Sequence, residues 1–496
     1  MSNRQSFREV LLQLVCLNCL ITKSYLLCVP GAHVFCNIQS LTSVRLIMSV
    51  TKPKVTDVFT SETIVFSDDG GWCWFESPGA LQYGSMLLIG SVASGGHDKN
   101  RCGNVELHVH DCLTQMTETI VLHDQFELDD HDGPALLIRP DGRLLILYAK
   151  HGTESHNYSR LSLPDTKSFN QFGPVQLYTP STATELTYAN LILLPNESNR
   201  IYDFFRGLHG SFKPSYLYSD DLGTSWHNGN VYINVPSTIK HRPYVRYTSN
   251  ERDTIHMIYT EGHPRDYDNS LYHIYYRSGD LYQSDGIKLS SLQVGLDSPD
   301  QGTKVYQGDS QHVAWIVDLI LDRNEYPVCI YSVQYNSEGL PVGQGGDDIR
   351  YRYARWNGSI WQNFSLAYAG CRLYSGEDDY TGLAVIEPDD PTVVYISTNS
   401  DPATGEPLIS RKDQQRHYEL FYGKTDDGGQ TWSWITLTSD STADNLRPMR
   451  PKCVNKSDPN PYRALVWLRG KYLAYTDYLQ EVVGRVWTVD PSRDIY

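Results

Sequence analysis

Two short segments far apart in the chain share one pattern, and this pattern decides the fold. Residues 219–226 have the sequence SDDLGTSW and residues 425–432 have the sequence TDDGGQTW, so both fit the form S/T-x-D-x-G-x-x-W. Residues 67–74, SDDGGWCW, form a degenerate third copy. A motif that recurs along a chain indicates a fold built from repeated units.

The sequence around these segments alternates between strands and tight turns. In one hairpin, the apolar residues 135–138 and 144–148 flank a turn at residues 140–142, where proline and glycine supply the turn dihedrals. Almost no stretch after residue 56 keeps a helical apolar period over three turns. Similar units recur at residues 63–89, 191–205, 244–259, 314–331, 383–396 and 464–475. We therefore expect an all-β chain, and the seven units predict a seven-bladed β-propeller.

The composition fits a globular chain and excludes one class of partner. Of the 496 residues, 40% are hydrophobic, so a sizeable core can be buried. The formal net charge is −16 and no run of five or more basic residues occurs, which argues against nucleic-acid binding. The 35 tyrosines and 10 tryptophans favour strands and also suit grooves that stack on sugar rings.

Residues 1–47 differ from the rest of the chain. Their apolar run at residues 10–17 is too short and too interrupted to cross a membrane. The segment fits an atypical secretory signal or sequence upstream of the true start, because Met48 directly precedes the first well-patterned segment. We expect residues 1–47 to be a leader and residues 48–496 to be a single propeller domain, secreted, monomeric and not bound to a membrane.

Histidines lie at both ends of the first hairpin described above. His131 belongs to the cluster DDHDGP at residues 129–134, and His151 follows the second strand. An antiparallel hairpin returns to the edge from which it started, so both imidazoles can share one surface patch.

The next two hairpins place tyrosine and arginine in the same way. Tyr188 and Arg206 lie at the two ends of one hairpin. Arg206 follows two phenylalanines, where its burial would be costly without a carboxylate from the protein or from a ligand, and both sources stay open. The following hairpin has Arg242 and Tyr244 at one end and His263 and Arg265 at the other.

On a propeller these side chains would line one groove, because the strand ends of neighbouring blades meet at the mouth of the central channel. An aromatic and cationic groove suits an acidic sugar, with Arg206 facing a uronate carboxylate. A His/Tyr pair beside it favours β-elimination, in which a base removes the proton α to the carboxylate and an acid protonates the leaving oxygen. This reaction requires no nucleophile and no cofactor.

Two other functions stay open. A glycoside hydrolase would need two placed carboxylates, and a sialidase would need an arginine triad with an N-terminal Arg-Ile-Pro segment that this sequence lacks. A non-catalytic propeller could instead bind acidic glycans, because the same fold hosts hydrolases, lyases and binding proteins.

Two family resemblances follow from these residues. The repeated segments resemble the Asp-box (BNR) repeats of sialidase-type propellers, in which the Asp caps a β-turn and the Trp packs between strands. A second resemblance covers roughly residues 60–480 and is to seven-bladed propeller polysaccharide lyases, which include ulvan lyases and fungal rhamnose–glucuronate lyases. It is carried by DHDGPA at residues 130–135, Tyr188-Ala189-Asn190, Phe205-Arg206-Gly207 and Arg242-Pro243-Tyr244.

The resemblance to these lyases implies a reaction and residue roles. The chain would cleave a uronate polysaccharide of the rhamnose–glucuronic acid type, such as ulvan or gum arabic, and leave a 4,5-unsaturated uronate. His131 and Tyr188 would be the catalytic acid and base, in either order, and Arg206 would neutralise the carboxylate. The substrate-binding residues would be His151, Asn190, Arg242, Tyr244, His263 and Arg265.

The same resemblance bears on the alternative reaction and on metal ions. Related propellers include rhamnosidases that cleave the same linkage, so hydrolysis remains the alternative. Family members can carry a calcium or zinc ion with a mainly structural role. Weak candidates for ligands here are His312, Cys329, Cys371 and Cys453.

Overall fold

The structure is a computed structural model with two compact units, residues 1–54 and residues 55–496. The residues that it describes are 56–164, 168–209, 212–234, 242–336, 338–454 and 461–489, together with three short strands before them. These three strands form one antiparallel sheet of β1 (Leu27–Val29), β2 (Ala32–Phe35) and β3 (Ile47–Ser49). The rest of the predicted leader lies outside the described residues.

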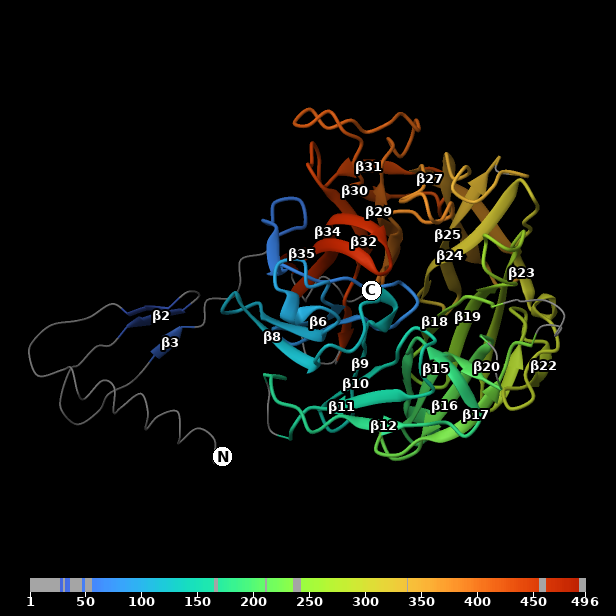
Figure 1. Cartoon of the computed structure of the whole chain (residues 1–496), viewed down its shortest axis with the longest axis horizontal. Coiled ribbons are helices and arrows are strands. Elements are labelled where there is room, and N and C mark those ends of the chain that lie inside the picture. Colours follow the sequence, from blue (N-terminus) through green and yellow to red (C-terminus); the bar gives the residue numbers. More distant parts are fainter. Residues whose placement is uncertain are drawn as a thin grey trace, which may run out of the picture. The chain divides into compact units, whose positions relative to one another are not determined.

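In the described part of the second unit, seven sheets of antiparallel strands follow one another around a ring (Figure 1). This arrangement confirms the predicted all-β, seven-bladed β-propeller. Blade 1 consists of β5 (Ala80–Tyr83), β6 (Met86–Val92), β7 (Val105–Asp111) and β8 (Met116–His123). Blade 2 consists of β9 (Ala135–Ile138), β10 (Leu144–Tyr148), β11 (Asn157–Leu161) and β12 (Gln176–Tyr178).

Blades 3 and 4 carry additional strands. Blade 3 consists of β13 (Ala183–Thr187), β14 (Leu191–Leu194), β15 (Arg200–Leu208), β16 (Pro214–Ser219) and β17 (His227–Val231). Blade 4 consists of β18 (Val245–Ser249), β19 (Thr254–Thr260), β20 (Leu271–Arg277), β21 (Asp280–Tyr282), β22 (Lys288–Ser291) and β23 (Thr303–Tyr306).

The last three blades complete the ring. Blade 5 consists of β24 (His312–Leu321), β25 (Pro327–Tyr335), β26 (Asp348–Trp356) and β27 (Trp361–Gly370). Blade 6 consists of β28 (Ala384–Glu387), β29 (Asp390–Thr398), β30 (Glu419–Lys424) and β31 (Ser433–Thr436). Blade 7 consists of β32 (Asp444–Met449), β34 (Tyr462–Ala474), β35 (Asp477–Thr488) and β4 (Ile64–Ser67), while β33 (Lys452–Val454) pairs in parallel with β5 of blade 1.

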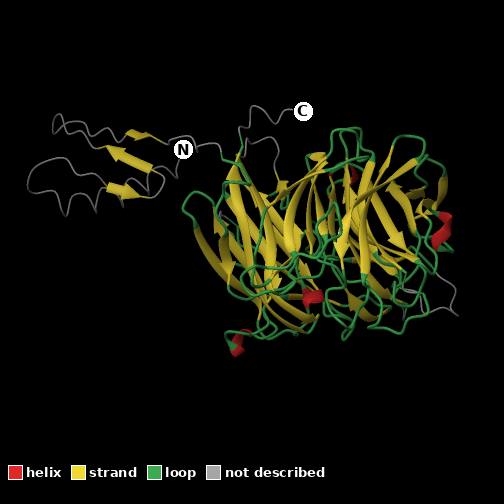
Figure 2. Ribbon diagram, turned by 90° about the horizontal axis from the view of Figure 1, so that it is seen from above, coloured by secondary structure: helices red, strands yellow, loops and turns green. Residues whose placement is uncertain are grey.

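Helical structure is confined to single turns among the described residues. They are the 3-10 helices η1 (Lys99–Arg101), η2 (Asp130–Asp132), η3 (Pro195–Glu197) and η4 (Pro299–Gln301), and Figure 2 shows how small a part of the propeller they form. No helix in the described ranges has the length and apolar character needed to span a membrane.

The segment between β4 and β5 fills the centre of the ring. Its residue Trp74 packs against Trp315 of β24 and against Tyr380, with ring centroids 5.0 and 5.2 Å away. The guanidinium groups of Arg246 and Arg447 donate hydrogen bonds to two backbone carbonyls of the same segment. Contacts with several blades therefore hold this segment in the channel.

The two intact Asp boxes form turns with their polar groups satisfied. Asp427 accepts hydrogen bonds from the backbone N–H and the hydroxyl of Thr431 at 2.9 and 2.7 Å, and Asp221 makes the equivalent pair of bonds in the other box. The degenerate third copy differs, because Asp69 accepts from the backbone N–H groups of Ser94 and Gly95 instead. Residues 67–74 are thus not an Asp-box turn.

Two of the seven predicted hairpins are partly wrong. The unit at residues 63–89 is divided, because β4 pairs with β35 of blade 7 and only β5 and β6 belong to blade 1. The unit at residues 464–475 has no turn near Arg469, since β34 runs through that residue and pairs with β35. The first error arises because the ring closes by pairing the start of the domain with its end, which local sequence does not show. The second is a misplaced turn, because the hairpin of β34 and β35 turns after Ala474.

Candidate active site

Three consecutive blades deliver the predicted side chains to one mouth of the channel. His131 lies on η2 just before β9 and His151 follows β10, while Tyr188 precedes β14 and Tyr244 precedes β18. The ring of His131 lies 5.8 Å from the ring of Tyr188, which in turn lies 6.5 Å from Tyr244. Hairpin ends of neighbouring blades therefore meet as the sequence predicts.

The two histidines form a stacked pair held by one carboxylate. Their rings are 4.0 Å apart and inclined by 14°. Asp129 accepts a hydrogen bond from Nδ1 of His131 at 2.7 Å on one oxygen and from Nδ1 of His151 at 2.8 Å on the other. A carboxylate can only accept, so both histidines carry a proton on Nδ1.

The protonation states of the two histidines differ. Burial lowers the pKa of His131, but Cys73 and the carboxylates of Asp129 and Asp130 outweigh it and raise this pKa well above its usual range. Burial and the charge of His131 lower the pKa of His151 to about 4. At neutral pH the pair therefore holds one positive charge on His131, and Nε2 of His151 is an unprotonated acceptor.

Arg206 lies between two tyrosine rings. Its guanidinium carbon is 4.5 Å from the ring centroid of Tyr188 and 4.6 Å from that of Tyr244. Phe75, from the segment in the channel, supports both rings from below at 5.7 and 4.8 Å. Tyr188 adopts a left-handed backbone conformation with φ 73°, which is strained for a tyrosine and aims its ring at this cluster.

Arg206 has no counter-charge in the part of the chain that the structure describes. It is 3% exposed, and its Nε and Nη1 atoms have no hydrogen-bond partner among the described residues. No described carboxylate forms an ion pair with it, so the internal salt bridge that the sequence left open is not observed. The hydroxyl of Tyr188 is also buried without a partner. A buried cation and a buried hydroxyl without partners are costly unless a ligand satisfies them.

His263, Arg265 and Arg242 lie on the rim beside Tyr244. The ring of His263 is 5.5 Å from Tyr244, and burial together with Arg265 and Arg242 lowers its pKa well below the usual range. Arg265 pairs with Glu377, and Arg242 lies 3.7 Å from Asp266. The cations of the rim are thus matched by acids, unlike Arg206.

Asn190 has a different position from the one expected. Its side chain is 2% exposed, donates to the backbone carbonyl of Phe204 at 2.9 Å and accepts from the hydroxyl of Ser77 at 2.8 Å. The amide is used inside the protein, so Asn190 ties β15 to the channel segment and offers no free group to a substrate.

Two residues of the site, Asp129 and Tyr475, were not predicted from the sequence. Asp129 was within a quoted cluster, and its two-residue separation from His131 is the signal that could have identified it. Tyr475, at the turn between β34 and β35, lies edge-on to both histidine rings at 5.4 and 5.5 Å and is 37% exposed. Its position depends on the closure of the ring, so no local signal could have found it.

Two further acids, Glu76 and Asp132, have buried carboxyl groups. The carboxyl oxygens of Glu76 and Asp132 are buried and have no hydrogen-bond partner within the described protein. Burial raises the pKa of both groups well above the usual range. Burial therefore favours the neutral forms of both groups.

Two groups of described side chains have the donor types of a metal site. In the group of Asp129, His131 and His151, the stacked rings direct their Nδ1 atoms along nearly parallel lines, so they do not converge on one ion. The group of Cys73, Asp130 and His131 combines the donor types that zinc prefers. Neither group contains the four candidates from the sequence, His312, Cys329, Cys371 and Cys453.

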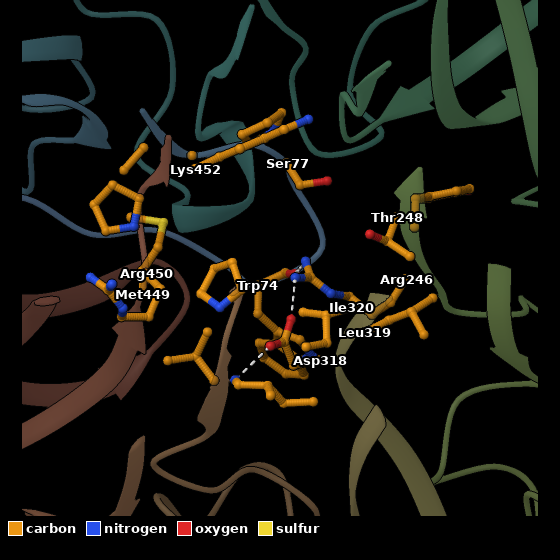
Figure 3. A pocket seen from close by; sticks show the side chains of 18 of the residues that line it. Trp74, Ser77, Arg246, Thr248, Asp318, Leu319, Ile320, Met449, Arg450 and Lys452 are labelled. Atoms are coloured by element: carbon orange, nitrogen blue, oxygen red, sulfur yellow. Dashed lines mark hydrogen bonds and ion pairs between the residues drawn. The ribbon is translucent and has the colours of Figure 1, made fainter. Parts of the chain in front are cut away.

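A cavity of about 390 Å³ lies toward the other end of the channel. It is lined by the later residues of β18 and β24, whereas Tyr244 and Trp315, at or near the starts of these strands, pack against each other, and Trp315 also packs against His263. Figure 3 shows Arg246 directed at Asp318 in this cavity, at 3.2 Å. Arg450 likewise pairs with a glutamate, so the cations here are matched, unlike Arg206.

Comparison with known proteins agrees with this fold. A family model described as BNR repeat-containing family member matches residues 103–369. No curated protein matches the sequence. An ulvan lyase of a new polysaccharide lyase family, bound to -[GlcA(1-4)Rha3S]-, is 16% identical with a TM-score of 0.58, and the match covers 85% of this chain and 95% of the other. The polysaccharide lyase Uly1 is 11% identical with a TM-score of 0.52, covering 84% and 90%.

Proposed function

We propose that this protein, which belongs to the BNR repeat-containing family, is a polysaccharide lyase that cleaves uronate-containing glycans by β-elimination. The main support for the proposal is Arg206, which is buried between two tyrosine rings and has no carboxylate partner among the described residues. A uronate supplies the missing carboxylate, and its ring stacks on aromatic faces.

The first requirement of β-elimination is neutralisation of the uronate. Removing the proton at C5 places negative charge on the carboxylate, and cations held in place stabilise that charge without reorganisation. Arg206 and the imidazolium of His131 are the two cations of the cluster. They flank Tyr188, whose ring lies 5.8 Å from the ring of His131 and 4.5 Å from the guanidinium carbon of Arg206.

The second requirement is a base and an acid. The sequence-based expectation gave these roles to His131 and Tyr188 in either order. We assign the acid to Tyr188, because burial raises the pKa of its phenol well above the usual range and its hydroxyl has no partner. The base is then the imidazole pair, whose free nitrogen is Nε2 of His151 while His131 carries the charge.

The proposed substrate class is the rhamnose–glucuronic acid type, represented by ulvan and gum arabic. Its support is that two proteins with this fold are described as polysaccharide lyases and one is bound to a glucuronate–rhamnose fragment. No cofactor is needed for the chemistry, since the chain's own residues provide the cation, the acid and the base. Secretion is part of the proposal, because a polysaccharide substrate lies outside the cell. The proposal also keeps the expected monomeric state.

The test compares the wild-type protein with His131→Ala and Arg206→Ala on ulvan and gum arabic. Ultraviolet absorbance of the 4,5-unsaturated uronate is recorded beside the release of reducing sugar. We expect absorbance to rise with the wild type on at least one polymer and to be lost in both variants.

Other outcomes decide between the alternatives. Reducing sugar without ultraviolet absorbance would replace the lyase by a glycoside hydrolase. Binding of either polymer by the wild type and by His131→Ala, with no product from either, would replace it by a non-catalytic propeller.

A further inference from the structure

We propose that Cys73, Asp130 and His131 form a binding site for Zn²⁺, and that zinc bound there switches the enzyme off. The binding site is an inference from the side chains alone. Its inhibitory effect rests on the proposed function, because zinc would take the imidazole that the reaction uses.

The three donors come from two segments that are tied together. Cys73 belongs to the segment in the channel, and Asp130 and His131 belong to η2. The backbone N–H of Cys73 donates to the carbonyl of Asp130 at 2.9 Å. The thiol, one carboxylate oxygen and one ring nitrogen lie within 4.8 Å of one another, and all three residues are buried. Only small side-chain shifts separate this set from zinc–ligand distances of about 2.0–2.3 Å.

Asp130 has one oxygen available for a metal ion. Its Oδ2 accepts hydrogen bonds from Arg447 at 2.6 Å and from the hydroxyl of Tyr472 at 2.8 Å. Its Oδ1 is buried and has no hydrogen bond, although Nδ1 of His131 lies 2.9 Å away. Asp130 is thus fixed in position by one oxygen while the other is directed at the imidazole.

The donor set selects the class of metal. A thiolate with an imidazole and a carboxylate suits zinc and similar borderline or soft ions, whereas calcium and magnesium take oxygen ligands. Three protein ligands leave the fourth tetrahedral position for water. The second donor group, which contains the stacked histidines, lacks a thiol and has the parallel geometry described above.

Zinc binding balances as an exchange of one ion for two protons. Zn²⁺ enters, the thiol of Cys73 loses its proton, and the imidazolium of His131 loses one of its two protons. The summed charge of the cluster is unchanged, but Nδ1 of His131, the ring nitrogen beside Asp130, gives up its hydrogen bond to Asp129. With its ring bound to zinc, His131 no longer shares Asp129 with His151, so the stacked pair that the reaction uses is broken.

Binding is measured by zinc titration calorimetry on the full chain, comparing the wild type with Cys73→Ser. The matched control is Cys112→Ser, which changes another buried free thiol that lies in no donor group. We expect Cys73→Ser to lose one zinc equivalent, with affinity at that site reduced at least about 100-fold, and Cys112→Ser to keep it. The other cysteines are present in all three proteins, so the comparison isolates Cys73. Identical titrations of the wild type and a folded Cys73→Ser would overturn the site.

A second measurement needs no variant at Cys73. Alkylation of the wild type with iodoacetamide, followed by peptide mass spectrometry, reports each thiol separately. We expect zinc to slow alkylation of Cys73 and to leave Cys112 unchanged. Equal effects of zinc on both thiols would contradict the site even if Cys73→Ser failed to fold.

The inhibitory effect is measured apart from binding. Zinc is expected to abolish the rise in ultraviolet absorbance in the wild type and in Cys112→Ser, while Cys73→Ser retains the rate that it has without metal. Zinc binding at Cys73 without inhibition of an active enzyme would overturn the switch. If no lyase activity is found on any polymer, the proposed function fails while the titration still decides the site.

Discussion

Two arginines of this propeller are buried to nearly the same extent and contact aromatic rings in the same way, yet they differ in one respect. Arg447 is 2% exposed and lies 4.4 Å from the ring of Tyr472, and Arg206 is 3% exposed between Tyr188 and Tyr244. Arg447 forms an ion pair with Asp130 at 2.6 Å, whereas no described carboxylate pairs with Arg206.

The difference separates a structural cation from a functional one. A buried charge that is paired within the protein belongs to the fold, because removing either member leaves the other uncompensated. A buried charge without a partner costs stability, and a protein retains it where a ligand supplies the counter-charge. The pair of arginines thus predicts opposite effects of the same substitution.

The largest expected effect is on stability, at Arg447. Arg447→Met leaves the carboxylate of Asp130 buried without its cation, so we expect the free energy of unfolding to fall by about 3–5 kcal/mol. Denaturant unfolding measures it. An unchanged midpoint would mean that Asp130 finds another partner and that the comparison with Arg206 does not hold.

The second effect is on activity, at Arg206. Arg206→Met removes the cation that faces the developing charge, so we expect kcat/KM for a uronate polymer to fall by about 100-fold to 1000-fold. The free energy of unfolding should fall by less than about 1 kcal/mol or should rise, because an unpaired buried charge is lost. A strong loss of stability would show that Arg206 serves the fold, as Arg447 does.

The third effect is the dependence of activity on pH, which tests the role of the imidazole pair beside Arg206. Burial and the charge of His131 lower the pKa of His151 to about 4, so its base form persists above that pH. We expect kcat/KM to fall as pH drops below about 4, by up to tenfold per unit, and not near 6.5, the ordinary value for histidine. Circular dichroism at each pH distinguishes this fall in kcat/KM from unfolding of the protein. An acid limb near 6.5 would exclude His151 as the base.

The smallest effect concerns Tyr475, which contacts the histidines from the edge of the groove. Tyr475→Ala removes an exposed ring that can stack on a sugar, and we expect KM to rise about tenfold with little change in kcat. Tyr475→Phe is the control, because it keeps the ring and should restore KM. A fall in kcat at constant KM would instead assign Tyr475 a role in holding the histidines.

The sequence predicted the fold and the meeting of hairpin ends because both follow from local patterns. Period-two strands and the turns between them place His131, Tyr188 and Tyr244 at the same edge of consecutive blades. The sequence could not show whether a carboxylate of the protein pairs with Arg206, because every candidate partner comes from elsewhere in the chain. It assigned Asn190 to substrate for the same reason: a motif gives the residue type but not its hydrogen-bond partners.

The site residues that the sequence did not predict reach the site through contacts between distant parts of the chain. Tyr475, in the turn between two strands of the last blade, lies against His131 at the start of the second blade, so the contact joins the two ends of the propeller. The donor group of Cys73 likewise does not show in the sequence around it, since its neighbours come from η2 and not from its own segment.

The central claim is that Arg206 binds the substrate carboxylate, and a double-mutant cycle tests it most directly. Calorimetry compares a glucuronate oligosaccharide with its carboxyl-reduced analogue, each bound to Tyr188→Phe and to Tyr188→Phe with Arg206→Met, so that turnover does not interfere. We predict that reducing the carboxylate weakens binding at least about tenfold when Arg206 is present and has no effect when it is absent. An equal loss in both proteins would contradict the account.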